Sequence, residues 1–196
     1  MLPEDQLRET ILTLPLAPLH GPWFRVVGFG ELLGGPPGLP GPQWLWTSGQ
    51  SQRFTPLNGP KTLYLAVDPY TALAETETLV LDSKGQQILR PIPPKVLFSV
   101  QGIALAVLDL TDPRVQATIG TSAQELAGPW INTPPGQLAP TQMLGKLAFE
   151  SGGIVGLLAS SRWRSPGQDI AIFANRLADH PPSYIEVVGI DGTRLP

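Results

Sequence analysis

Apolar residues along this chain recur in short groups that polar, Gly-rich or Pro-rich segments separate. Between residues 4 and 14 they fall on one side of a helix, with most charged residues opposite. Other apolar groups are too short for helices and predict strands. Because helices and strands are mixed along the chain without a repeat, the pattern predicts an α+β fold in one domain, with short strands in small sheets and flanking helices. The expected strands cover residues 23–27, 62–67, 87–90, 95–99, 103–110, 154–158, 170–173 and 184–188.

Two helices are expected to begin at an Asp-Pro pair, where the carboxylate caps the helix and proline fits its first turn. Asp68-Pro69 predicts a helix to about Leu79, and Asp112-Pro113 predicts one that stops at Gly120. Three other features complete the pattern: a capping box at Ser122 and Glu125, a helix over residues 140–151, and a turn at Asp191-Gly192.

Residues 28–60 are rich in Gly and Pro and show no periodic pattern apart from a short segment at 44–47. They predict a long surface loop over the functional site, since loops of this length in compact domains are usually functional or mobile.

The composition excludes several classes of protein. An apolar fraction of 42% with 15% charged residues indicates a folded chain, and a net charge of −3 disfavours direct nucleic-acid binding. The chain has no cysteine and only two histidines, His20 and His180, so no metal is expected. The sequence shows neither a signal peptide nor an apolar run long enough for a bilayer, so we expect a cytoplasmic protein without membrane contact.

Residues 53–75 carry the candidate chemistry. Arg53 opens a Pro/Gly loop, Tyr64 lies inside an apolar strand, and Glu75 lies about two turns into the helix that begins at Asp68. A cation, an aromatic ring and a carboxylate in one cleft would bind an anionic ligand with an aromatic ring and stabilise a cationic transition state. Each residue alone is equally compatible with a surface arginine, a core aromatic or a solvated carboxylate.

Arg25 and the serine pair Ser160-Ser161 are also compatible with either a structural or a functional role. Arg25, in an otherwise apolar strand, could lie at a solvated edge or hold phosphate. Ser160 and Ser161 follow a strand and could form a polar turn or orient a ribose hydroxyl or a carboxylate. No histidine neighbours them in sequence, so a hydrolase triad is not predicted. The tryptophans receive no ligand role.

The order and spacing of these motifs resemble the RES domain family, which is named for its arginine, glutamate and serine. The likeness runs from about residue 20 to 190, which divides the chain into an N-terminal helical segment, residues 1–19, and a RES domain, residues 20–196. The segments that carry it are Phe24-Arg25-Val26-Val27, Arg53-Phe54-Thr55-Pro56, Leu63-Tyr64-Leu65-Ala66, Ala72-Leu73-Ala74-Glu75, and the strand pair around Ser160-Ser161-Arg162 and Asp169-Ile170-Ala171.

The resemblance implies a fold similar to ADP-ribosyltransferase toxins and a cleft for NAD as substrate. It also implies cleavage of the nicotinamide–ribose bond, by hydrolysis or phosphorolysis, which depletes cellular NAD. The partner implied is an Xre-type helix-turn-helix antitoxin. Two alternatives stay open, namely ADP-ribosyl transfer to a protein and a non-catalytic nucleotide- or partner-binding module, and a homodimer is also left open.

The resemblance assigns a role to each candidate residue. Arg25 and Arg53 would hold NAD, Tyr64 would pack on the nicotinamide side, and Glu75 would stabilise the ribosyl oxocarbenium. Ser160 would position the ribose or the carboxamide; it is preferred to Ser161, which aligns with an alanine of the family. The sequence departs from the family at three positions, with Gln52 for glycine, Ala159 for proline and Asp169 for asparagine.

Overall fold

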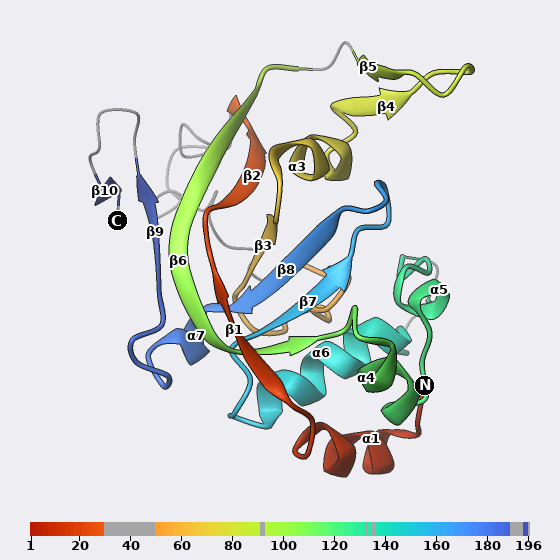
Figure 1. The fold of residues 1–196 in the computed structure, drawn as a ribbon. Helices are drawn as coiled ribbons and strands as arrows, with labels where there is room; N and C mark the ends of the chain where they lie inside the picture. Colours follow the sequence, from red (N-terminus) through yellow and green to blue (C-terminus); the bar gives the residue numbers. More distant parts are fainter. Residues whose placement is uncertain (30–49, 91–92, 132, 135, 189–193, 196) are drawn as a thin grey trace.

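The computed structural model describes residues 1–29, 50–90, 93–131, 133–134, 136–188 and 194–195 (Figure 1). The segment expected at 44–47, most of the loop expected at 28–60, and the Asp191-Gly192 turn lie outside the described residues. The helices are α1 (Glu4–Ile11), α3 (Pro69–Glu75), α4 (Pro113–Thr118), α5 (Ala123–Leu126), α6 (Pro140–Glu150) and α7 (Ala174–Leu177). The strands are β1 (Leu16–His20), β2 (Trp23–Gly28), β3 (Thr62–Ala66), β4 (Leu79–Leu81), β5 (Gln87–Leu89), β6 (Lys95–Asp109), β7 (Gly156–Ser160), β8 (Gln168–Phe173), β9 (Tyr184–Val188) and β10 (Arg194–Leu195).

The mixed α+β class is confirmed, and most strands of the described chain belong to one sheet of eight. Its order is β10-β9-β6-β2-β3-β8-β7, and β1 pairs with β6. Strands β4 and β5 form a separate two-stranded ribbon that projects from the body (Figure 1). Among the described residues, no helix is both long and apolar enough to cross a bilayer.

Strand β6 closes the central sheet into a ring of paired strands. Its first part pairs antiparallel with β2, and its end, Val107–Asp109, pairs parallel with β7. The path β6-β2-β3-β8-β7 therefore returns to β6. The sequence analysis predicted two separate strands here, over residues 95–99 and 103–110. A Cβ built on Gly102 would overlap the carbonyl oxygen of Tyr184, so glycine lets β9 approach closely without breaking the strand.

Two helix ends differ from the predictions, and the sequence analysis did not predict β1, β4, β10 or α7. The first helix ends at Ile11, and the segment expected to be helical up to residue 19 contains β1, which pairs with β6. Strand β1 contains a proline and is mostly exposed, so its sequence lacks the alternation of a half-buried strand. The helix expected to reach Leu79 ends at Glu75, because Glu77 adopts a positive φ of 55° and Leu79 begins β4.

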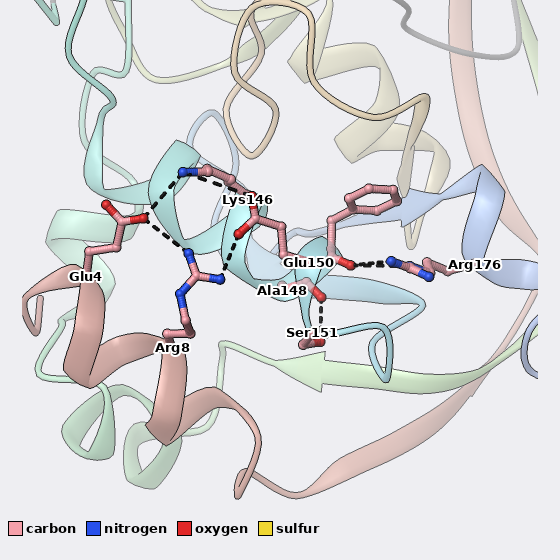
Figure 2. Close-up of polar contacts among 8 residues, drawn as sticks. Glu4, Arg8, Lys146, Ala148, Glu150, Ser151 and Arg176 are labelled. Carbon is pink, nitrogen blue, oxygen red and sulfur yellow. Dashed lines mark hydrogen bonds and ion pairs between the residues drawn. The ribbon is translucent and has the colours of Figure 1, made fainter.

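The N-terminal helix packs directly on the main core. Leu7 and Ile11 are buried in the same cluster as Leu144 of α6 and Leu157 of β7. Ion pairs accompany this packing (Figure 2): Arg8 donates to Glu150 at 2.9 Å, and Lys146 donates to Glu4 at 3.3 Å. These side chains are substantially exposed, so we attribute the attachment of α1 mainly to its buried leucine and isoleucine.

Candidate active site

A cavity of about 340 Å³ lies among β2, β3, β8, α3 and the loops that precede β3 and follow β7. Four of the five residues selected from the sequence line it, namely Arg25, Arg53, Tyr64 and Glu75. Ser160 is not among its lining residues. The other charged or large aromatic side chains of the lining are Phe24, Phe54, Trp130, Arg162, Trp163 and Asp169.

Helix α6 holds the loop that carries Arg53. The Gln142 amide donates to the Ser51 hydroxyl at 2.7 Å and to the Gln52 carbonyl at 3.1 Å. The helix approaches so closely that a Cβ built on Gly145 would overlap the carbonyl oxygen of Phe54. The loop is therefore fixed by the helix on one side, which defines the position of Arg53.

The Arg53 guanidinium connects three parts of the chain. Its Nε and Nη2 donate to the Leu126 carbonyl at 3.1 and 2.9 Å, and its Nη1 donates to the Ser160 carbonyl at 3.0 Å. Burial lowers the pKa of Arg53, while the nearby carboxyl of Asp169 opposes that shift. An arginine nevertheless stays protonated in proteins, so the cavity contains a largely buried positive charge.

The Tyr64 hydroxyl is used inside the fold. It accepts a hydrogen bond from the Phe54 backbone N–H at 3.0 Å and shares another with the Thr55 hydroxyl at 2.8 Å. Burial raises the pKa of Tyr64 to about 12, so the phenol stays neutral at physiological pH. The resemblance assigns Tyr64 to the nicotinamide side of the cleft, and the structure gives its hydroxyl an anchoring role in the Arg53 loop.

Glu75 is the last residue of α3. Asp68 fixes the other end of this helix, since its carboxylate accepts from the Tyr70 and Thr71 N–H groups at 3.0 Å. A carboxylate at a helix C-terminus lies at the negative end of the helix dipole, so Glu75 is not placed to stabilise the helix. Instead, Glu75 accepts a hydrogen bond of 2.5 Å from the Ser161 hydroxyl. That hydroxyl is itself oriented by the N–H groups of Trp163 and Arg164.

Ser160 and Ser161 differ in the face of the sheet that they follow. Leu157 and Ala159 of β7 belong to the core cluster that contains Ala171, and successive strand residues alternate between faces. Ser160 therefore follows the opposite face; its side chain is exposed, and only its carbonyl contacts Arg53. Ser161, one residue later, reaches Glu75. The structure thus brings Ser161 rather than the preferred Ser160 to the carboxylate.

Asp169 is a site residue that the sequence reasoning treated only as a departure from the family. It pairs with Ala66 and Ala159 at the start of β8, is buried, and lies 3.8 Å from Arg53, measured from Oδ2 to Nη1. Burial and the neighbouring Glu75 raise the pKa of Asp169 to about 9, against the opposing effect of Arg53. A carboxylate directly before the apolar run of residues 170–173 was the signal available in the sequence.

Two loop tryptophans also reach the cavity, although the sequence analysis assigned them no ligand role. Trp130 and Trp163 both line it, and the Arg162 guanidinium lies 5.2 Å from the centre of the Trp163 ring. Trp163 is about half exposed, as a side chain at the mouth of a site can be. Nothing in the spacing of these tryptophans distinguishes them from loop anchors.

Comparisons with known proteins place this chain in a family. The sequence model of the RES domain matches residues 33–191. No curated protein sequence matches the chain. Among solved structures, one chain of the crystal structure of the M. tuberculosis MbcT–MbcA toxin–antitoxin complex has a TM-score of 0.63 at 15% identity, and the match covers 97% of this chain and 92% of that one. This likeness shows a shared fold. Because the family match covers most of the sequence, the chain belongs to the RES domain family.

Proposed function

We propose that this protein cleaves the nicotinamide–ribose bond of NAD, by hydrolysis or phosphorolysis, as a toxin that depletes NAD. The observation that carries the proposal is the meeting of Arg25, Arg53, Tyr64 and Glu75 at one cavity, with Ser161 bonded to Glu75. Guanidinium groups suit phosphates, aromatic rings suit nicotinamide, and a fixed carboxylate suits a cationic sugar. Membership of the RES family supports the same assignment.

In the proposed binding mode the pyrophosphate lies beside Arg25 and Arg53. Leu126 and Ser160 occupy three N–H groups of Arg53, and a guanidinium has five. One N–H on each terminal nitrogen is therefore left for a ligand or for Asp169. The Tyr64 and Trp163 rings supply apolar surface for nicotinamide.

In the proposed reaction the bond between C1′ and the nicotinamide nitrogen breaks, and its electron pair leaves with nicotinamide. The positive charge that develops on the ribose is stabilised by the Glu75 carboxylate, which the Ser161 hydroxyl holds in one orientation. An oxygen of water or inorganic phosphate then bonds to C1′, and the proton of the attacking water passes to solvent. The products are nicotinamide and either ADP-ribose or ADP-ribose that carries a phosphate on that same carbon.

The decisive experiment incubates the purified protein with NAD, with and without phosphate, and separates the products by chromatography. Glu75→Gln should reduce nicotinamide release about a hundredfold to a thousandfold, the usual cost of removing one such stabilising group. Glu77→Gln is the matched control, because Glu77 lies two residues away, is exposed and pairs with Arg90. Intact NAD after long incubation would refute the proposal, and a labelled protein band would instead indicate ADP-ribosyl transfer.

We also propose a protein antitoxin as partner, of the Xre-type helix-turn-helix class. A solved structure with the shared fold is a toxin–antitoxin complex, which supports a partner of this kind. Expression of the chain alone should slow bacterial growth, and co-expression of a small helix-turn-helix protein encoded beside it should restore growth. Normal growth without such a neighbour would contradict the proposal.

A further inference from the structure

Asp169 and Glu75 place two carboxyl groups at one cavity, and no cation of the described residues pairs tightly with either of them. Both line the cavity, and Asp169 is 9% exposed. Among the described residues, the nearest positive group to Asp169 is Arg53, at 3.8 Å, which is beyond hydrogen-bond range. Arg53 keeps this distance while its Nε, Nη1 and Nη2 donate to backbone carbonyls.

The other charged and titratable groups around Asp169 and Glu75 do not offset the negative charge of the two carboxyl groups. Arg25 of β2 donates to the Tyr64 carbonyl at 2.7 Å, and Tyr64 of β3 is a neutral phenol. Asp68 at the start of α3 adds negative charge near Asp169, although Arg164 pairs with it at 3.1 Å. Arg162, after β7, contacts the Trp163 ring at the same cavity.

We propose that Asp169 is a positioning residue that carries a proton at neutral pH and donates it in a hydrogen bond to the Glu75 carboxylate. Two carboxylates at one cavity, of which Asp169 is buried, cannot both stay charged at low cost, so one of them retains a proton. Burial and the Glu75 charge both raise the pKa of Asp169, as this arrangement requires. The shared cavity and the burial of Asp169 support the proton sharing, and its effect on catalysis rests on the proposed function.

This arrangement predicts an alkaline limit to activity. When Asp169 loses its proton, the hydrogen bond becomes a repulsion between two negative charges, and Glu75 is no longer held where the ribosyl cation forms. Asp169→Asn keeps an N–H donor and cannot ionise, so it should remove the alkaline limit. Asp169→Ala removes the donor, so it should release less nicotinamide than Asp169→Asn at neutral pH.

The test measures kcat/KM for nicotinamide release between pH 6 and 10 for the natural chain, both Asp169 variants and Asp179→Asn. Asp179 is half-exposed and pairs with Arg176, so its variant should follow the natural profile. The kcat/KM of the natural chain should fall about tenfold per pH unit above the pH at which the two carboxyl groups titrate. The same alkaline fall in Asp169→Asn, or activity no higher than that of Asp169→Ala, would overturn the proposal.

A second measurement separates this inference from the proposed function, because it needs no activity. A carboxyl whose pKa is raised in the folded state keeps a proton that the unfolded chain releases above its ordinary pKa near 4. The thermal stability of the natural chain should therefore fall relative to Asp169→Asn as pH rises from about 4 toward 9. Parallel stability curves would overturn the proton sharing. Absence of nicotinamide release with diverging curves would refute only the proposed reaction.

Discussion

At the residue scale, Tyr64 has two functions, one for its ring and one for its hydroxyl. The ring lines the cavity, and the hydroxyl oxygen accepts a hydrogen bond from the Phe54 N–H and shares another with the Thr55 hydroxyl. Since Phe54 follows Arg53, the position of the buried guanidinium depends on a side chain eleven residues later in the sequence. A change at Tyr64 should therefore affect both the stability of the fold and the placement of Arg53.

Tyr64→Phe should lower the free energy of unfolding by about 1–3 kcal/mol, because it leaves a buried N–H without its acceptor. It should also slow nicotinamide release through the loosened Arg53 loop. Denaturant unfolding of the variant beside Tyr70→Phe measures the effect, since the exposed Tyr70 should change stability by less than about 0.5 kcal/mol. Equal stability of the two variants would show that the Tyr64 hydroxyl is not an anchor.

Residue types and their order were sufficient to name Arg25, Arg53, Tyr64 and Glu75, which the fold brings to one cavity. The serine that reaches Glu75 lies one position after the preferred Ser160, and this difference depends on where β7 ends and on which face each residue follows. Asp169 was not selected because its importance arises from burial beside Glu75 and Arg53, and those neighbours come from other elements. Local sequence thus identified the chemical groups of the site. It did not indicate which carboxyl group is expected to carry a proton.

At the element scale, the contact between α6 and the Arg53 loop determines the site. Gly145 allows the helix to touch the Phe54 carbonyl, and Gln142 bonds the loop beside it. Elsewhere in a helix, alanine would be preferred to glycine by about 1 kcal/mol. Here the missing Cβ matters more, since it sets the distance between the helix and the loop.

Gly145→Ala should therefore lower the melting temperature and reduce nicotinamide release, because the added methyl group must push the Arg53 loop away from the helix. Gly153→Ala offers a matched control, since a Cβ built there meets no atom within 4 Å. Thermal unfolding and the product assay check both variants. A Gly145→Ala protein that is more stable and fully active would mean that the loop adapts without cost.

Elements with strong local signals were predicted closely. Helices α4 and α6 and strand β3 agree within two residues, because an Asp-Pro cap, an apolar face or a β-rich run defines each one. The early end of α3, the continuity of β6 and the existence of β1 were missed. Each depends on a backbone conformation or a strand partner that the local pattern does not encode.

At the scale of the whole molecule, the N-terminal helix is part of the main core. Leu7→Ala should lower the free energy of unfolding by about 2–5 kcal/mol, since Leu7 is fully buried and its loss leaves a cavity. Leu12→Ala, one residue beyond the same helix, should have little effect because Leu12 is 67% exposed. Urea unfolding compares the two, and an equally small loss in both would show that α1 is not anchored by its leucine.

The fold class followed from the alternation of elements, but the closed ring of strands did not. The ring depends on β6 meeting β2, which lies about seventy residues earlier, and β7, which lies about fifty residues later. Pairings at such separations have no signature in a local window of sequence.

The closed ring also sets the order in which the protein can acquire its chemistry during translation. The walls of the cavity come from β2, β3 and β8, and β8 is the last of them to leave the ribosome. A nascent chain that has emerged only as far as β7 has Arg53 and Glu75 but lacks the strand that carries Asp169 and pairs with β3. The growing polypeptide therefore remains without a completed site until β8 has been synthesised and has left the ribosome.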